Sequence, residues 1–216
     1  MNVAVIDYRA GNLRSVETAL RHLGADFAVT GQPRELGRAR RLLVPGVGEA
    51  RAAMEALAEN GLGEAVREFA ASGRPVLGIC LGSQVIFERS EERDTPCLGL
   101  LPGVVRRFPA ALREAGLKVP HMGWNRVHPV HRPNSGLRPG GPHPLLAGVA
   151  DGAFFYFVHS YYPEPAAAEL VLAECDYGLR FAAGVGRGNL AAFQFHPEKS
   201  GSAGLRLLAN FLDWEP

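Results

Sequence analysis

A cysteine placed between two glycines is the first feature of the sequence that suggests chemistry. The segment is Gly78-Ile79-Cys80-Leu81-Gly82, and it joins an apolar run expected as a strand to apolar positions expected as a helix. A nucleophile on such a turn has a strained backbone, and flanking glycines remove the Cβ atoms that would collide with neighbouring elements. The helix N-terminus favours a thiolate and offers N–H groups to an oxyanion. Cys80 is therefore a candidate nucleophile, although this segment alone also fits a buried structural cysteine.

A second motif, His196-Pro197-Glu198, supplies the groups that a cysteine nucleophile needs. It directly follows the strand-like segment 191–195, so it should lie at the C-terminal end of a strand, where parallel sheets form their sites. His196 would act as the base, and Glu198 would hold its tautomer and orientation. Other histidines compete for the role of base, but none has both a preceding strand end and a carboxylate two residues on: His22, His121, His128, His131, His143 and His159.

The segments that would position these residues alternate between strands and helices in the first half of the chain. Continuous apolar runs predict strands at 3–6, 27–29, 42–44 and 75–79, and helical spacing predicts helices at 13–23, 52–57, 64–71 and directly after Cys80. Asn12 is placed to cap the first helix and Gly24 to end it. This alternation predicts a parallel sheet covered by helices on both faces.

The second half contains mostly strand-like segments, at 103–105, 153–158, 169–173, 181–185 and 189–195. They predict antiparallel additions to the sheet, followed by a final helix over 201–213 with Ser200 as its cap. The stretch 128–148 is dense in Pro and Gly and predicts a long surface excursion. We therefore expect one α/β domain over residues 1–216, with a mixed, mostly parallel central sheet and helices on both faces, in a flavodoxin-like arrangement.

Composition excludes several classes of protein. The 216 residues carry a formal net charge of +1, and their basic residues are scattered, so a nucleic-acid partner is not expected. No apolar stretch approaches the ~20 residues that cross a bilayer, and the start shows no basic leader or cleavage site. We therefore expect a cytoplasmic protein without a membrane partner. The three cysteines, Cys80, Cys97 and Cys175, have no metal-ligand spacing, so neither a metal nor a cofactor is expected.

Two motifs together carry a family resemblance. The segments Gly78-Ile79-Cys80-Leu81-Gly82-Ser83-Gln84 and Gln194-Phe195-His196-Pro197-Glu198 resemble the class I (triad-type) glutamine amidotransferases, and the similarity covers essentially the whole chain. Most members of that class have Pro-Gly-Gly at the oxyanion strand, whereas this chain has Pro45-Gly46-Val47-Gly48. With Asp7-Tyr8, the segment 10–13 and the segment 119–125, this pattern resembles the glutaminase subunits of imidazole glycerol phosphate synthase in histidine biosynthesis.

The resemblance implies a role for each matching residue. Cys80 would attack the side-chain amide of glutamine and form a γ-glutamyl thioester, while His196 transfers the protons and Glu198 orients His196. The N–H groups of Val47 and Leu81 would form the oxyanion hole. Glutamine would be bound by five residues: Gly46, Gln84, Glu92, Ser160 and Tyr161.

The same resemblance implies a protein partner. Ammonia would pass to a (β/α)₈-barrel cyclase subunit in a heterodimer, which forms imidazole glycerol phosphate and an aminoimidazole carboxamide ribotide. The expected interface residues are Asn12, Met122, Trp124, Asn125, Tyr156 and Lys199. Because Val47 lies between two glycines, its peptide can rotate with little steric cost. A misdirected N–H would leave the isolated subunit nearly idle until the partner binds.

Some positions depart from the family pattern, and other functions remain open. Arg9 stands where the family usually has glycine, and Glu49 stands where a small residue is common. The glutaminases of anthranilate, guanylate or pyridoxal phosphate synthesis share the triad but should have Pro-Gly-Gly, which Val47 contradicts. A flavodoxin-like binding or redox-sensing module would need no His-x-Glu motif. A cysteine peptidase or deglycase shares the cysteine turn, but Gln84 and Glu92 favour free glutamine.

Overall fold

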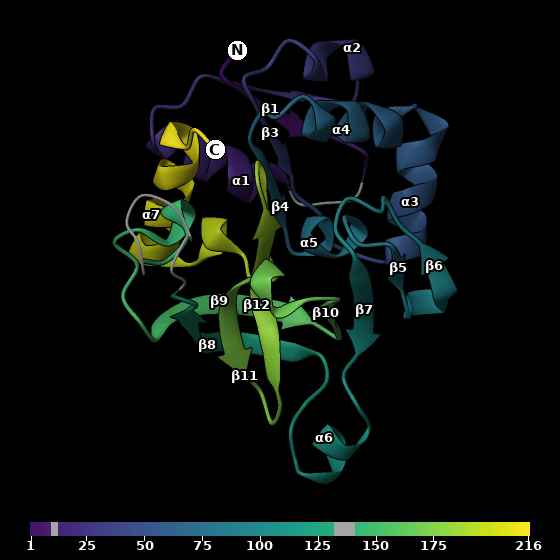
Figure 1. Cartoon of the computed structure of the whole chain (residues 1–216), viewed down its shortest axis with the longest axis vertical. Helices are drawn as coiled ribbons and strands as arrows, with labels where there is room; N and C mark the ends of the chain where they lie inside the picture. Colours follow the sequence, from purple (N-terminus) through teal and green to yellow (C-terminus); the bar gives the residue numbers. More distant parts are fainter. Residues whose placement is uncertain (10–12, 132–140) are drawn as a thin grey trace.

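The computed structural model describes residues 1–9, 13–131 and 141–216, and within them nine strands form one central sheet (Figure 1). The order is β2-β1-β3-β4-β13-β12-β11-β8-β9. The first five strands in this order are parallel: β2 (Phe27–Thr30), β1 (Val3–Ile6), β3 (Arg41–Val44), β4 (Val76–Ile79) and β13 (Leu190–Phe193). The other four are added antiparallel: β12 (Arg180–Arg187), β11 (Val171–Asp176), β8 (His121–Pro129) and β9 (Ala153–His159).

Helices cover both faces of the sheet, as the sequence predicts. One face carries α1 (Leu13–His22) and α7 (Gly201–Asp213), and the other carries α2 (Pro33–Leu36), α3 (Ala50–Glu59), α4 (Leu62–Ala71) and α5 (Leu81–Val85) (Figure 1). The alternation of side chains along β1 explains the two layers. Val3 and Val5 pack into the core beneath α1 and α7, whereas Ala4 and Ile6 pack into the core beneath α3 and α4.

A second, smaller sheet lies beside the first and was not predicted from the sequence. Its order is β10-β7-β5-β6, formed by β10 (Tyr161–Pro165), β7 (Gly103–Arg107), β5 (Arg89–Ser90) and β6 (Thr95–Pro96). The short helix α6 (Ala111–Glu114) follows β7, and single turns of 3₁₀-helix occur at η1 (Glu92–Asp94), η2 (Pro144–Leu146), η3 (Ala168–Leu170) and η4 (Pro197–Lys199). Because β10 begins directly after β9, Ser160 and Tyr161 lie where the chain passes from one sheet to the other.

Four expectations about the second half are wrong. The segment 189–195 contains β13, which is parallel to β4 and not an antiparallel addition, and the segment 103–105 lies in β7 of the smaller sheet. Ser200 precedes α7 but does not cap it with its side chain, because its hydroxyl donates to the His196 carbonyl and accepts the N–H of Tyr156. The stretch 128–148 is not simply a surface excursion. His128 and Pro129 end β8, and Leu145 and Leu146 are fully buried in the core that α7 covers. Residues 132–140 of this stretch lie outside the described residues.

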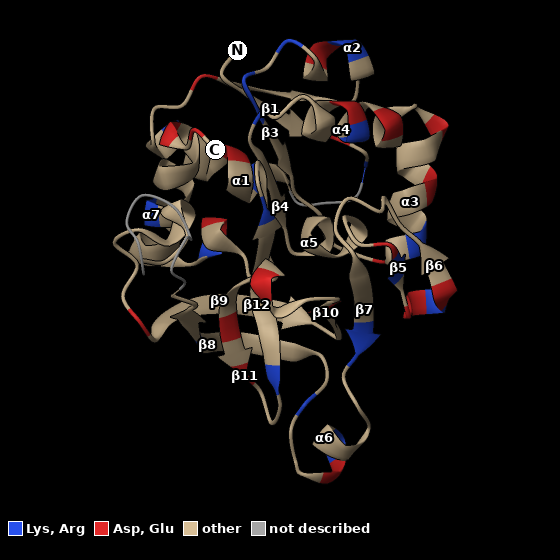
Figure 2. Ribbon diagram, viewed as in Figure 1, with Lys and Arg blue, Asp and Glu red and all other residues tan. Residues whose placement is uncertain are grey.

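Charged side chains are mixed around the molecule. Figure 2 shows acidic and basic residues interspersed on α2, α3, α4 and the β5–β6 hairpin, without a stripe of one sign on these elements. No helix in the described part of the chain is long and apolar enough to cross a membrane.

Candidate active site

The turn between β4 and α5 has the strained geometry that a nucleophile on a sharp bend requires. Cys80 has φ 54° and ψ −108°, a conformation that a residue with a side chain rarely adopts. A Cβ on Gly78 would lie 2.9 Å from the Ala192 Cβ, and a Cβ on Gly82 would lie 1.8 Å from the Val44 carbonyl oxygen. Both flanking glycines are therefore required by close packing, which holds the cysteine on its turn.

His196 and Glu198, the expected base and its carboxylate, lie at the end of the neighbouring strand. β13 pairs in parallel with β4, so the segment after β13 reaches the same sheet edge as Cys80. His196 Nδ1 and Glu198 Oε1 are 2.8 Å apart, and their side chains are 2% and 3% exposed. A carboxylate accepts at this distance, so Nδ1 carries the proton and Nε2 holds the lone pair. Nε2 is buried and has no hydrogen-bond partner in the described part of the chain, which leaves it available to a thiol proton.

The electrostatics of His196 favour its protonated form. Burial alone would lower the pKa of His196, but its interactions with the nearby Cys80 side chain and with the hydrogen-bonded Glu198 raise this pKa well above its usual value. An imidazole that is stabilised as the cation is suited to take a proton from the thiol and to return it to a leaving amine.

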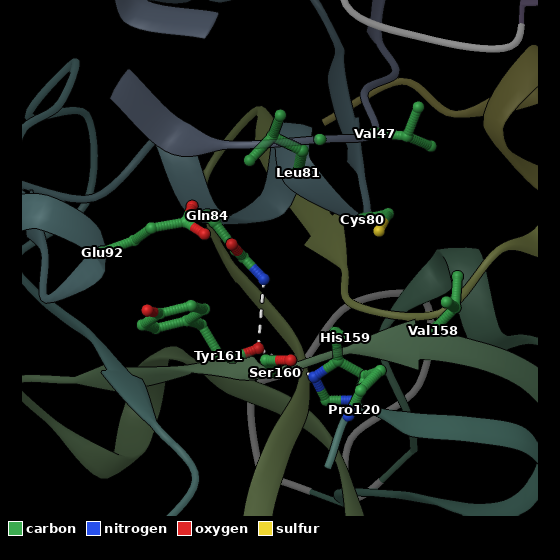
Figure 3. A pocket seen from close by; sticks show the side chains of 11 residues that line it. Val47, Cys80, Leu81, Gln84, Glu92, Pro120, Val158, His159, Ser160 and Tyr161 are labelled. Atoms are coloured by element: carbon green, nitrogen blue, oxygen red, sulfur yellow. Dashed lines mark hydrogen bonds between the residues drawn. The ribbon is translucent and has the colours of Figure 1, made fainter. Parts of the chain in front are cut away.

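A cavity of about 270 Å³ opens in front of Cys80 (Figure 3). Of the residues expected at the site, six line it besides Cys80: Val47, Leu81, Gln84, Glu92, Ser160 and Tyr161. Gly46 is not part of this lining and is buried within the segment 45–48. A Cβ there would lie 2.1 Å from the Tyr8 hydroxyl oxygen, whose hydrogen donates to the Pro45 carbonyl at 2.8 Å.

The two expected oxyanion donors point in different directions in this structure. The Leu81 N–H donates to the Gly46 carbonyl oxygen at 3.2 Å. That carbonyl shares a planar trans peptide with the Val47 N–H, so the Val47 N–H points away from Leu81. A carbonyl oxygen therefore faces the Leu81 N–H, where the Val47 N–H was expected to join it. Gly48 has φ 105°, a value that glycine adopts without strain.

Glu92 lies at the far end of the cavity and also caps a helix. Its Oε2 accepts the Ala50 N–H, at the start of α3, at 2.7 Å. Burial is the main cause that raises the pKa of Glu92, and the negative charge of Glu49 adds to it. Glu49 itself forms an ion pair with Arg93 at 2.6 Å. A cation placed in the cavity, such as an α-ammonium group, would stabilise the Glu92 carboxylate.

Several residues expected to bind a partner form one exposed patch. Met122 and Trp124 are 63% and 56% exposed, on the outward side of β8. Tyr156 is directly opposite Trp124 in the β8–β9 register, with their rings 6.1 Å apart, and the Lys199 ammonium nitrogen lies 6.0 Å from the Tyr156 ring. The Tyr156 ring is also 6.4 Å from the His196 ring, so the patch borders the triad.

Other expected positions have different surroundings. The Asn125 side chain donates to the Asp176 carbonyl at 2.8 Å and contacts His121 at 3.3 Å. Asn12 lies outside the described residues. Arg9, which replaces the usual glycine, has φ 63°, so its position has a glycine-like backbone conformation.

Sequence reasoning assigned no role to Gln194, whose side chain contacts Cys80. Its Nε2 lies 3.9 Å from the Cys80 sulfur, and its Oε1 accepts from Gln84 Nε2 at 2.8 Å. Its spacing could have identified it. Side chains two positions apart near a strand end project to the same side, so Gln194 lies on the side of His196.

The two other cysteines, Cys97 and Cys175, do not line the cavity in front of Cys80. Burial raises the pKa of Cys97 to about 11 and that of Cys175 to about 12, which keeps both as thiols near neutral pH. In the described ranges, no group of three or more His, Cys, Asp or Glu side chains is arranged to hold a metal ion.

Comparison with known proteins places this geometry in context. The family model described as "Glutamine amidotransferase class-I" matches residues 4–214. The chain is 52% identical to "Imidazole glycerol phosphate synthase subunit HisH" of Methylococcus capsulatus, over 100% of this chain and 97% of that protein. It is 50% identical to the protein of the same name from Aromatoleum aromaticum, over 100% and 99% of the two chains. A solved structure described as "Crystal structure of glutamine amidotransferase" has a TM-score of 0.73 at 22% identity, covering 99% of this chain and 98% of that one, and so supports the fold.

Proposed function

Since this chain belongs to the class I glutamine amidotransferases, within the family of imidazole glycerol phosphate synthase subunit HisH, we propose that Cys80, His196 and Glu198 are its catalytic triad. The protein is the glutamine-hydrolysing subunit of that synthase and serves histidine biosynthesis. The observation that carries the residue assignment is the strained Cys80 turn, which lies at the same sheet edge as the buried His196–Glu198 pair.

The geometry supports a two-step acyl transfer. His196 Nε2 takes the thiol proton, and the Cys80 sulfur attacks the side-chain amide carbon of glutamine. When the tetrahedral intermediate collapses, His196 returns the proton to the leaving nitrogen, so ammonia departs and a γ-glutamyl thioester remains. Water, deprotonated by the same imidazole, then releases glutamate. Glu198 stabilises the imidazolium throughout, because it accepts from Nδ1.

The cavity fits the substrate's two ends. The reacting amide lies against Cys80, and the α-carbon end extends toward Glu92, where the α-ammonium group balances the buried carboxylate. Gln84, Ser160 and Tyr161 form the polar wall between them (Figure 3).

One peptide rotation would assemble the oxyanion hole. Turning the peptide between Gly46 and Val47 removes the carbonyl that now accepts from Leu81, and it brings the Val47 N–H to the same place. Both donors then face the oxyanion. Since one such donor contributes about 10² to 10³ in rate, the subunit with the present orientation should turn over glutamine slowly.

The partner is a (β/α)₈-barrel cyclase subunit that receives the ammonia. Met122, Trp124, Tyr156 and Lys199 form the docking patch, and its proximity to His196 supports an exit for ammonia beside the triad. Coupling of cyclase binding to the peptide rotation would prevent waste of glutamine. The cytoplasmic location expected from the sequence stays a prediction.

Glutaminase assays with and without the partner test this function. We expect slow glutamate release by the isolated chain and a stimulation of about 10² or more when the cyclase and its ligand are added. Cys80→Ala should abolish turnover, while Cys97→Ala, at a cysteine that does not line the cavity, should retain it. Equal turnover with and without the cyclase would contradict the proposed switch, and an active Cys80→Ala variant would contradict the site.

A further inference from the structure

One main-chain carbonyl in the wall of the cavity accepts hydrogen bonds from two side chains on opposite sides. The Tyr161 carbonyl oxygen is 2.7 Å from His159 Nδ1 and accepts from Gln84 Nε2 at 3.1 Å (Figure 3). A carbonyl oxygen can only accept, so His159 must carry its proton on Nδ1 and Gln84 must turn its amide nitrogen toward Tyr161. This carbonyl therefore fixes the direction of every hydrogen bond that continues from either side chain.

The hydrogen bonds that continue from Gln84, here called the inner arm, lead to Cys80. Gln84 Nε2 also donates to Gln194 Oε1 at 2.8 Å, so the Gln194 nitrogen has to face the other way. That nitrogen lies 3.9 Å from the Cys80 sulfur and donates to it. A donor aimed at the sulfur holds the Cys80 side chain in place.

The hydrogen bonds that continue from His159, here called the outer arm, lead away from the cavity to β8. With its proton on Nδ1, His159 accepts at Nε2 from His121 Nδ1 at 3.0 Å. His121 then accepts at Nε2 from Asn125 Nδ2 at 3.3 Å, and the same amide donates to the Asp176 carbonyl. Asn125 is the neighbour of the exposed Trp124 on β8.

Burial makes both arms costly to rearrange. Gln84, Gln194, His121 and His159 are each at most 5% exposed, and buried polar groups lose stability when a partner is removed. Burial also holds the pKa of His121 at about 4 and that of His159 at about 3, so both rings are neutral near pH 7 and keep one tautomer. Four aromatic rings surround the imidazole pair: Phe108, Phe157, Tyr177 and Phe181.

We propose that Gln194 is a positioning residue for the Cys80 sulfur, and that the chain through Gln84, the Tyr161 carbonyl, His159 and His121 couples it to Asn125 on β8. A shift of β8 on docking would thus reach the nucleophile by a route separate from the Val47 peptide. The coupling to docking depends on the proposed function, whereas the contact between Gln194 and Cys80 does not.

Substitution of Gln194 tests the inner arm. Gln194→Met removes the donor with little change of shape, and Gln194→Glu keeps an oxygen for Gln84 but replaces the N–H donor by a carboxylate. In the complex with the cyclase, both should lower kcat by about 5- to 10-fold, as expected for one lost hydrogen bond, with KM for glutamine within about twofold. KM should change little because Gln194 does not line the cavity.

Alkylation of Cys80 by iodoacetamide in the isolated chain, followed by mass spectrometry, gives a readout that needs no glutamine turnover. Gln194→Met and Gln194→Glu should both slow it, and the exposed control Gln32→Met should not. Unchanged kcat and unchanged alkylation in folded variants would overturn the proposal, as would a raised KM with normal kcat. If the wild-type complex does not hydrolyse glutamine, the proposed function fails, while alkylation still tests the contact.

A double-mutant cycle tests the coupling between the two ends. Asn125→Ala and Gln194→Met are measured singly and together in the complex at saturating cyclase. The loss in kcat of the double variant should be smaller than the product of the losses of the two single variants. His121→Phe, which interrupts the chain between them, should behave like Asn125→Ala. The control cycle pairs Gln194→Met with His128→Ala, whose exposed side chain lies on the same strand and pairs with Asp151. If the losses in kcat of the single variants multiply to give that of the double variant, both for Asn125 and for His121, the proposed coupling is overturned.

Discussion

Replacing Glu198 by glutamine should slow glutamine hydrolysis without abolishing it. Glutamine can still accept the Nδ1–H of His196, so the tautomer is kept and only the negative charge is lost. A hydrogen bond to a charged group contributes about 1.5–3 kcal/mol, against about 0.5–1.5 kcal/mol for a neutral pair. The difference of about 1–2 kcal/mol corresponds to a loss of roughly 5- to 30-fold in kcat. The two side chains are only 2% and 3% exposed, so solvent does not screen this loss.

Glu198→Ala provides the comparison that separates charge from orientation. It leaves Nδ1 of His196 unpaired in a buried site, and the added desolvation penalty should bring the loss in kcat to about 10² or more. Glu64→Gln, at a surface carboxylate paired with Arg67, is the matched control and should be silent. Steady-state glutaminase rates with saturating cyclase measure all three variants. Equal rates for Glu198→Gln and the wild type would refute the role assigned to the charge.

The pH dependence of stability gives the same prediction an independent check. Because the pKa of His196 is raised in the fold, its contribution to stability is complete below its unfolded pKa of about 6.5 and is lost as pH rises through the folded value. Glu198→Gln weakens this effect. Urea unfolding should therefore show a larger stability difference between variant and wild type at pH 6 than at alkaline pH, and the opposite order would contradict the explanation.

Three further outcomes are expected. Gly82→Ala should lose about 3 kcal/mol of unfolding free energy in urea, since its Cβ would lie 1.8 Å from the Val44 carbonyl oxygen. Trp124→Ala should weaken cyclase binding by about 2 kcal/mol, roughly 30-fold in Kd by calorimetry, while an unchanged Kd would remove it from the interface. His121 and His159 have folded pKa values of about 4 and about 3, below the unfolded value of about 6.5. The contribution of these two histidines to the free energy of unfolding should therefore be complete above pH 6.5 and should be lost as pH falls. The loss should be smaller in His121→Phe.

Strands β1 to β4 could be predicted because they are short, apolar on both faces and separated by helices with clear periodicity, whereas the parallel pairing of β13 with β4 was not predicted. β8 was recognised only as a family motif and not as a strand. Its outward residues Met122 and Trp124 are apolar, so the strand lacks the usual alternation of apolar and polar side chains. The apolar side chains that a docking surface needs thus hide the alternating pattern by which the strand could have been predicted.

The position of Cys80 and His196 at one edge of the sheet could be predicted, because each follows a strand-like segment directly. The contact of Gln194 with Cys80 depends on the pairing of β13 with β4, which local sequence does not specify. Ser200 shows the reverse effect. Its position favours a helix cap, but its hydroxyl bonds to the main chain of His196 and Tyr156 and so supports the site.

Active-site labelling tests most directly the central claim, that Cys80 is the nucleophile. The complex with the cyclase is treated with a glutamine-like chloroketone, and the modified peptide is located by mass spectrometry, with Cys80→Ala as control. We expect one label, on Cys80, that free glutamine competes away and that the control lacks. Label on Cys97 or Cys175, whose pKa values burial raises, would contradict the site and the mechanism built on it.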